Sequence, residues 1–394
     1  TIASGAPQIV PESALLETLK HGKPLNINLG VDPTAPDIHL GHAVPLRKLR
    51  QFQDLGHGVT LIIGDGTALI GDPSGRNSTR PQLSREQIKA NAETYVNQAF
   101  KILDPEKTTL RYNSEWILSL NMEELLKLMA QFTVARILER DDFHNRYTSN
   151  LPISLHEFMY PVMQAYDSVV IKADVELGGT DQLFNLLAGR ELMEKLGMEP
   201  QVCLTLPLLE GTDGVKKMSK SYGNYIGLTD EPSDMFGKVM SIPDELMVKY
   251  YRLASTESVS AIDEIEAGLA NDELHPNKVK RALARNIVAA YYDEEQANAA
   301  EEQFDLVFKK HDVPDDVAEY TPDLTPNEEG LVYLAKIIHD AGLAQSVGEA
   351  RRLIDGGGVK LNGDAVAPKV YNVEPEKLKD CVLQVGKRKF IKLV

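Results

Sequence analysis

The chain has 394 residues, of which 43% are hydrophobic and 25% charged, and its formal net charge is −16 at pH 7. It is too long for a single hydrophobic core, so two or three domains of ordinary globular composition are expected. The acidic balance argues against general affinity for nucleic acid, so contact with RNA would need local basic patches. No apolar run is long enough to span a bilayer, no secretory leader pattern opens the chain, and the two cysteines lack metal-ligand spacing, which favours a cytoplasmic protein.

The first informative stretch lies where a predicted strand turns into a predicted helix. Residues 25–29 form a short apolar run typical of a buried strand, and residues 44–55 carry apolar side chains at helical spacing until Gly56 ends the pattern. Pro45 is expected in the first turn of this helix, where an amide has no partner to lose. Free amides and a partial positive charge gather at a helix start, which makes it a natural phosphate site.

The segment His39-Leu40-Gly41-His42 stands at this helix start. The two histidines are three residues apart, so both can face one ligand, and Gly41 removes a side chain where that ligand comes close. A helix can also begin this way without any function, so the motif is informative only together with a partner elsewhere in the chain.

The next elements predict a doubly wound parallel sheet. Residues 59–65 form an apolar, β-branched run between glycines, typical of a strand that is buried on both faces. Strand, helix and strand at this spacing make one crossover unit of an α/β fold. Ligands of such sheets bind at the carboxyl ends of the strands, where Asp32 and the stretch 65–72 fall.

A turn-rich loop over residues 71–80 follows, then a predicted helix over 84–103, a strand over 110–113 and short helical patterns over 116–150. The loop ends in two arginines and is equally well explained as a solvated turn.

Three polar residues on the helix that follows share one face. Tyr160, Gln164 and Asp167 are spaced four and then three apart on an otherwise apolar segment. Polar groups are costly to bury without partners, so this face is either a solvated stripe or the wall of a polar pocket. Residues 169–177 then predict a strand closed by Gly178 and Gly179.

A helix is expected from Asp181, the last strand of the sheet over 202–209, and then a lysine-rich segment between glycines, Lys217-Met218-Ser219-Lys220-Ser221. A lysine turn of this kind is by itself most often a solvated hinge. Together with residues 39–42, however, it resembles the two signatures of the class I aminoacyl-tRNA synthetases, the HIGH motif and the KMSKS loop. The first matches with one conservative change and the second in full.

Further motifs make the resemblance closer, to tyrosyl-tRNA synthetases of the bacterial form with a C-terminal S4-like domain. They are GDGT at 64–67, GDPSGR at 71–76, YPVMQAYD at 160–167 and GGTDQ at 178–182. The likeness runs from about residue 25 to the C-terminus. It implies a Rossmann-like α/β catalytic domain over residues 1–230, with an insertion at about 108–160 where the two subunits of a homodimer would meet.

The resemblance also implies which residues handle ATP, which would act as a substrate together with Mg²⁺. Arginine suits the leaving pyrophosphate because it stays charged and presents a fork of donors. Asp181 would meet the ribose, although a simple helix cap explains it as well. The expected catalytic and ATP-binding residues are Thr34, His39, Gly41, His42, Arg76, Arg80, Gly178, Gly179, Asp181, Lys217 and Lys220, and no residue is expected to hold a resident metal ion.

A second set of residues would bind L-tyrosine. By the resemblance, Asp72, Tyr160 and Gln164 hold the α-ammonium group and Asp167 accepts the phenolic hydroxyl. A buried carboxylate that is built to accept a hydroxyl is left unpaired by phenylalanine, which discriminates better than a cavity does. The full expected set is Asn28, Asp32, Asp72, Tyr160, Gln164, Asp167 and Gln182.

Asn28 is a departure from the family pattern. Many tyrosyl-tRNA synthetases place a second tyrosine at the matching position, where it also touches the substrate hydroxyl. An amide can still hydrogen-bond, directly or through water. The change leaves tryptophanyl-tRNA synthetase open as the nearest relative, whereas Asp167 and the string at 164–167 favour tyrosine.

The rest of the chain predicts RNA-binding parts. Residues 231–310 are helical in pattern, with Lys278, Arg281 and Arg285 on one helix face, and would form the anticodon-binding domain. Residues 311–329 are acidic and proline-containing, which is typical of a linker.

The last 65 residues, 330–394, resemble an S4-like RNA-binding domain. Ser346 and Glu349 predict a capped helix start, and Asn362-Gly363 predicts a hairpin turn after a strand over 359–361. Basic residues of such a domain would grip phosphates. The expected RNA-binding residues are Arg351, Arg352, Lys387, Arg388 and Lys389.

The hypothesis is therefore a tyrosine–tRNA ligase, a homodimer with tyrosine, ATP and tRNA(Tyr) as partners. A small-molecule nucleotidylyltransferase would share the His-x-Gly-His site, but would need neither the KMSKS loop nor two C-terminal RNA modules. A non-catalytic RNA-binding protein derived from a synthetase would be expected to have decayed motifs, and these are intact.

Overall fold

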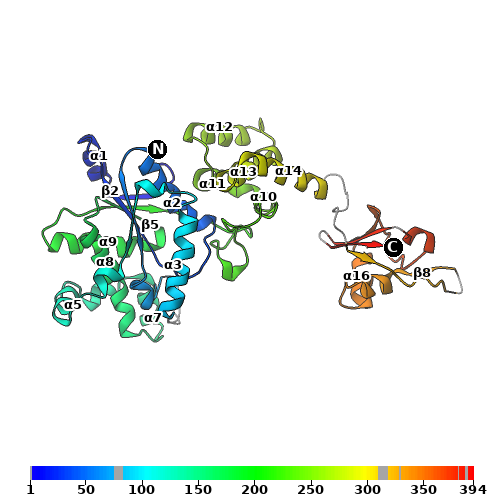
Figure 1. Ribbon diagram of the computed structural model, residues 1–394, viewed down its shortest axis with the longest axis horizontal. Helices are drawn as coiled ribbons and strands as arrows, with labels where there is room; N and C mark the ends of the chain where they lie inside the picture. The colour runs from blue at the N-terminus through cyan, green and yellow to red at the C-terminus, as the bar shows by residue number, and fades with distance from the viewer. Residues whose placement is uncertain (1, 75–82, 309–317, 328–329, 380, 387–388) are drawn as a thin grey trace. The chain divides into compact units, whose positions relative to one another are not determined.

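The computed structural model describes residues 2–74, 83–308, 318–327, 330–379, 381–386 and 389–394 (Figure 1). The chain forms two compact units, residues 1–298 and residues 299–394. None of the helices in the described part of the chain has the length and apolar character that a membrane span requires.

A six-stranded sheet forms the centre of the first unit. Its strands stand in the order β1-β6-β5-β2-β3-β4, and all neighbours are parallel except β1 and β6. The predicted doubly wound α/β sheet is confirmed, whereas the edge strand β1 was not predicted, because three residues carry no pattern of their own. The bounds are β1 (Gln8–Val10), β2 (Asn26–Val31), β3 (Gly58–Ile63), β4 (Thr108–Tyr112), β5 (Val175–Gly179) and β6 (Val202–Leu206).

Helices cover both faces of this sheet. In Figure 1 the strands run between α8 and α9 on the left and α2 and α3 on the right. The chain passes from β2 to β3 on one side and later returns to β5 on the other, so the carboxyl ends of β2 and β5 flank the topological switch point, where ligands of such sheets bind. The bounds are α1 (Glu12–Lys20), α2 (Leu40–Asp54), α3 (Arg85–Ala99), α8 (Met159–Ile171) and α9 (Leu183–Lys195).

Two local predictions were wrong. Helix α2 begins at Leu40, so Pro45 lies in its second turn and cannot donate to the carbonyl of Gly41. The strand predicted over residues 169–177 begins only at Val175, because α8 continues to Ile171 and ends at Lys172 in a left-handed conformation. The apolar run 169–171 is half-buried in the last turn of α8, and apolar content alone cannot distinguish such a helix end from a strand.

The insertion between β4 and α8 consists of short helices. Its apolar side chains pack on α8 and α9, with Phe143 fully buried against that cluster. Other large apolar side chains of the insertion stay exposed, Leu155 at 84% being the most exposed of them. The helices are α4 (Ser114–Ile117), α5 (Met122–Met129), α6 (Val134–Ile137) and α7 (Asp141–Thr148).

Five helices follow the sheet, and α11 packs directly on α2. The predicted basic face is interrupted, because Arg281 is buried and donates from Nε to Asn277 at 3.1 Å, while Lys278 and Arg285 are exposed. The helices are α10 (Pro232–Met240), α11 (Met247–Ala254), α12 (Val259–Ala270), α13 (Pro276–Tyr291) and α14 (Glu294–Phe308).

The second unit contains a five-stranded sheet in the order β10-β9-β12-β13-β7 and a separate pair, β11 and β8. Strand β7 (Glu319–Tyr320) pairs with β13, so the stretch predicted as a linker over 311–329 contains part of this sheet. The expected hairpin turn is present, with positive φ at Asn362 and Gly363. The remaining elements are β8 (Val332–Tyr333), α15 (Leu334–Asp340), α16 (Val347–Asp355), β9 (Val359–Leu361), β10 (Asp364–Ala365), β11 (Asn372–Val373), β12 (Val382–Val385) and β13 (Lys389–Leu393).

Candidate active site

Backbone hydrogen bonds bring the two signature segments together at the start of α2. The Leu40 N–H donates to the Ile226 carbonyl at 2.9 Å, and the Leu228 N–H donates to the Ile38 carbonyl at 3.1 Å. A Cβ at Gly41 would stand 3.1 Å from the His39 ring and 3.6 Å from Cβ of Met218, so only glycine fits there without a shift. Segments about 180 residues apart in sequence therefore form one site.

The two histidines of this site are neutral at pH 7. Their rings stack with centroids 3.9 Å apart. Burial, followed by the charges of His42 and Lys220, lowers the pKa of His39 to about 2. Although His42 is exposed, desolvation by the surrounding protein and the charges of Lys220 and Lys217 lower its pKa to about 4. Neutral imidazoles can donate hydrogen bonds to phosphate oxygens without adding charge.

The KMSKS loop lies beside the histidines. The ammonium group of Lys220 forms an ion pair with the carboxylate of Asp37, two residues before His39. The side chain of Asn224 organises the loop, since it accepts the Ser219 N–H at 2.8 Å and donates to the Lys217 carbonyl at 3.3 Å. The ammonium group of Lys220 could therefore leave the Asp37 carboxylate and bind a phosphate group at the same place.

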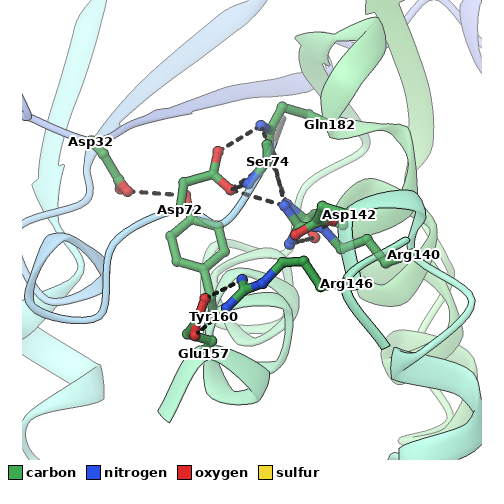
Figure 2. Close-up of polar contacts among 10 residues, drawn as sticks. Asp32, Asp72, Ser74, Arg140, Asp142, Arg146, Glu157, Tyr160 and Gln182 are labelled. Atoms are coloured by element: carbon green, nitrogen blue, oxygen red, sulfur yellow. Dashed lines mark hydrogen bonds and ion pairs between the residues drawn. The ribbon is translucent and has the colours of Figure 1, made fainter. Parts of the chain in front are cut away.

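A cluster of charges surrounds Asp72 (Figure 2). Arg140 donates to Oδ1 of Asp72 at 3.0 Å and Gln182 donates to Oδ2 at 2.8 Å. Ser74 adds two hydrogen bonds to Oδ1, from its backbone N–H at 2.8 Å and its hydroxyl at 2.7 Å. Burial acts to raise the pKa of Asp72, but the charge of Arg140 and these hydrogen bonds outweigh it and hold the pKa below its usual value. Arg140 was not predicted, because no motif surrounds it.

Tyr160 and Gln164 line the same side of the site. The Tyr160 hydroxyl donates to Asp32 at 3.0 Å, and Thr67 donates to the other oxygen of Asp32 at 2.7 Å. The Gln164 Oε1 atom is buried and has no hydrogen-bond partner. Such an acceptor is available to a donor on a ligand.

Asp167 lies buried on α8, and none of the cations in the described part of the chain acts on its pKa. Its two oxygens accept hydrogen bonds from Trp116 Nε1 at 2.8 Å and Asn113 Nδ2 at 3.2 Å. Burial raises the pKa of Asp167 well above its usual value, although both donors act to lower it. Trp116 and Asn113 were missed by the sequence reasoning. The one available signal was that Trp116 is the only tryptophan of the chain.

Asn28 occupies β2 between two other polar residues of the sheet. Its register partners are Thr60 on β3 and Glu176 on β5. The side chain is fully buried, and neither its amide nitrogen nor its oxygen has a partner. This amide is therefore available to a substrate or a water molecule.

Replacing Glu176 with glutamine should make folding less sensitive to pH. Burial raises the pKa of Glu176 to about 7, although hydrogen bonds from Ser168 and Gln201 act to lower it. The folded state keeps this proton up to about pH 7, whereas the unfolded chain releases it near the ordinary value of 4.5. The stability contribution of Glu176 is therefore full below pH 4.5 and lost as the pH rises through 7.

The neutral amide of Glu176→Gln avoids this loss. The variant should exceed the wild type in free energy of unfolding by about 2–3 kcal/mol at pH 8 and differ little at pH 4.5. Urea unfolding followed by circular dichroism measures both values, and an equal difference at the two pH values would contradict the assignment.

Of the other predicted residues, two glycines and Thr34 lie in the described part of the chain and two arginines do not. Gly179 leaves room for Asp181, whose carboxylate would lie 2.5 Å from a Cβ at residue 179. A Cβ at Gly178 would stand 3.1 Å from Leu186 and 3.2 Å from Cβ of Gln182. Thr34 is exposed in the loop after β2. Arg76 and Arg80 lie outside the described residues.

Comparison with known proteins identifies the fold just described. Residues 20–309 match the family described as "tRNA synthetases class I (W and Y)". The chain belongs to the class I tRNA synthetases. Its C-terminal part, residues 334–376, matches the S4 domain.

Full-length relatives of this synthetase are similar over nearly the whole chain. A protein of Moorella thermoacetica named tyrosine–tRNA ligase is 53% identical over 393 residues, covering 99% of this chain and 94% of its own length. A protein of Haemophilus influenzae with the same name is also 53% identical, over 390 residues that cover 99% of this chain and 94% of its own length. Among solved structures, tyrosyl-tRNA synthetase from Archaeoglobus fulgidus complexed with L-tyrosine has the same fold, with a TM-score of 0.63 at 24% identity, covering 76% of this chain and 96% of that one.

In the S4 unit of the synthetase, Arg351 and Arg352 are exposed on α16. The guanidinium of Arg351 lies over the rings of Tyr333 and Tyr371, 5.4 Å from each centroid. Lys389 donates to the Leu343 carbonyl at 2.9 Å. The other two predicted RNA-binding residues, Lys387 and Arg388, lie outside the described residues.

Proposed function

We propose that this class I synthetase is a tyrosine–tRNA ligase. It activates L-tyrosine with ATP to tyrosyl-adenylate and pyrophosphate, and then transfers the tyrosyl group to the 3′ end of tRNA(Tyr). Asp167 carries the choice of tyrosine, because a buried carboxylate that already holds two neutral donors can accept a phenolic hydroxyl as a third. Relatives named tyrosine–tRNA ligase at about 50% identity over the full chain support the same assignment.

In the first step, the tyrosine carboxylate attacks the α-phosphorus of ATP, and the bond to the bridging oxygen of pyrophosphate breaks. The protein supplies no nucleophile, so its contribution is positioning and stabilisation of charge on the phosphates. His39, His42 and Thr34 would bind the phosphates from one side, and Lys217 and Lys220 from the KMSKS loop on the other. Arg76 and Arg80 would meet the leaving pyrophosphate.

The tyrosine molecule would lie between Asp167 and Asp72. Asp72, Tyr160 and Gln164 would receive its α-ammonium group, and Gln182 would lie near its carboxylate. Asn28 would offer its unpartnered amide to the phenolic end, directly or through water. Gly178, Gly179 and Asp181 would contact the adenosine, with Asp181 at the ribose.

Magnesium would enter as part of the ATP substrate. Among the described residues, no group of three or more His, Cys, Asp and Glu side chains gathers in a way that could hold a metal ion. Mg²⁺ binds readily through substrate phosphates with one or two protein ligands, so a dedicated cage is not needed.

RNA contacts would come from the helices after residue 231 and from the S4 unit. The basic residues Arg351, Arg352 and Lys389 would meet tRNA phosphates, which gives positions for local contact on an otherwise acidic protein. We further propose that the enzyme works in the cytoplasm, where it would supply translation.

Subunit association would use the insertion. Met122, Leu126 and Val134 are 58–70% exposed there, along with Leu155. Apolar side chains gathered on one segment are typical of a protein–protein interface. We expect a homodimer whose dissociation constant rises at least about 100-fold when Leu126→Glu and Leu155→Lys are combined, because each change buries a charge at the interface.

Sedimentation velocity over a concentration series measures this association. The matched control is Leu55→Glu, which changes a leucine that is also exposed, to 53%, at the end of α2 and outside the insertion. A wild-type protein that sediments as a monomer at micromolar concentration would refute the dimer proposal.

The function itself is tested by exchange of labelled pyrophosphate into ATP with tyrosine, tryptophan or phenylalanine as the only amino acid. Exchange with tyrosine alone supports the proposal. Exchange with tryptophan would mean that the pocket has the specificity of a tryptophanyl-tRNA synthetase. No exchange with any of the three in folded protein would reject the activation step.

A further inference from the structure

We infer that Arg140 is the positioning residue of the α-ammonium site, which holds Asp72 in the orientation and ionised state that the substrate needs. The inference rests on the proposed function and extends it to a residue that does not touch the substrate. Arg140 stands at the start of α7, so the insertion supplies this part of the amino-acid pocket.

The guanidinium of Arg140 is buried, with 4% of its side chain exposed, and it is bound on several sides. Nη2 reaches Oδ1 of Asp72, Nη1 donates to Asn185 at 3.1 Å, and Nε pairs with Asp142 at 2.7 Å. Nη2 also donates to the Ser74 hydroxyl. A planar fork bound on this many sides has one orientation, which a flexible ammonium group could not reproduce.

The two oxygens of Asp72 have different surroundings. Oδ1 receives Arg140 and Ser74, whereas the one donor to Oδ2 among the described residues is the neutral amide of Gln182. Figure 2 shows the guanidinium of Arg140 on the Ser74 side of this carboxylate. Arg140 thus fixes one edge of the carboxylate and leaves the edge at Oδ2 to a substrate cation.

The charges of the cluster agree with this division. With Asp72 and Asp142 both ionised, one guanidinium faces two carboxylates, so the cluster carries one negative charge. An α-ammonium group would neutralise it. Arg140 therefore does not replace the substrate cation, and it offsets the cost of keeping Asp72 ionised away from water.

The test compares Arg140→Gln with the matched control Arg146→Gln. Arg146 is also buried on α7 and pairs with Glu157 at 2.6 Å (Figure 2). The charge of Asp142 acts on Arg146 too, so the control removes a neighbouring guanidinium while it keeps Asp142 and the pair of Arg140 with Asp72. Binding of labelled L-tyrosine without ATP is measured by equilibrium dialysis from pH 5 to pH 8. The Michaelis constant for ATP in pyrophosphate exchange is measured in parallel.

We expect Arg140→Gln to weaken tyrosine binding about 10- to 100-fold at pH 7, because the variant loses a hydrogen bond to a charged group. The Michaelis constant for ATP should stay within about twofold of the wild-type value. Without the guanidinium, burial raises the pKa of Asp72, so on acidification within the measured range the tyrosine affinity of the variant should fall more steeply than that of the wild type. The other titratable groups that face Asp72 among the described residues are Asp142, Tyr160 and Asp181, and the variant leaves them in place.

Arg146→Gln should lower stability but keep the wild-type pH profile of tyrosine binding. If Arg140→Gln does not fold, the pair Arg140→Lys and Arg146→Lys gives the same comparison, with about a tenfold loss of tyrosine affinity expected for the first alone. The inference would be overturned if the variant at residue 140 kept the wild-type tyrosine affinity and pH profile. It would also be overturned if the variants at residues 140 and 146 changed both by the same amount. Failure of wild-type exchange with tyrosine would instead reject the proposed function.

Discussion

Replacing Asp167 with asparagine is expected to weaken the enzyme's preference for tyrosine over phenylalanine. The carboxylate is buried and accepts from Trp116 and Asn113, so a third acceptor position is left for the substrate hydroxyl. Phenylalanine leaves that position empty in a desolvated pocket. Tyrosyl-tRNA synthetases are themselves the known example of rejection by an unpaired polar group, which discriminates far more strongly than pocket size.

We expect the ratio of kcat/KM values for tyrosine and phenylalanine to fall by about 10- to 150-fold in Asp167→Asn, since hydrogen bonds to charged groups contribute about 1.5–3 kcal/mol. Pyrophosphate exchange with each amino acid measures it. The matched control is Asp174→Asn, which removes an exposed carboxylate that accepts the Asn26 N–H at 2.7 Å, before the amino end of β5. A ratio that stays at the wild-type value would show that Asp167 does not read the hydroxyl.

Replacing Lys220 with alanine should slow formation of tyrosyl-adenylate by about 10²–10³-fold, the usual effect of losing one group that stabilises charge in the transition state. The ammonium group stands beside His39 and His42 and is held there by Asp37. Its charge is needed as negative charge develops on pyrophosphate, so tyrosine binding should stay within about twofold of wild type.

Single-turnover formation of adenylate and equilibrium dialysis of tyrosine separate the two effects. Lys216→Ala is the matched control, because Lys216 is exposed in the same loop and its ammonium group lies over the Tyr222 ring at 5.0 Å. Equal losses of rate and of tyrosine affinity in Lys220→Ala would mean that Lys220 acts in binding rather than in the transition state.

Sequence patterns predicted most strands of the central sheet. The apolar runs at 25–29, 59–65 and 202–209 overlap with β2, β3 and β6, because residues buried on both faces of a parallel sheet leave an uninterrupted apolar signal. The strand predicted over 169–177 was wrong in its first half, since the half-buried last turn of α8 is also apolar and joins the run of β5. Edge strand β1 and strand β7 were missed, because two or three residues become strands only through the partner they pair with.

By itself the sequence determined the order of the motifs, the α/β class and the family, because helix starts, glycine turns and strand ends are encoded by neighbouring residues. It could not place Arg140, Asn113 or Trp116 at the site, which they reach from the insertion and the end of β4. Only the tertiary structure decided that Asp72 lies beside the guanidinium of Arg140, whereas Asp167 accepts from two neutral donors. The reason is that the energy of a buried charge depends on groups distant in sequence, which come together only when the chain folds.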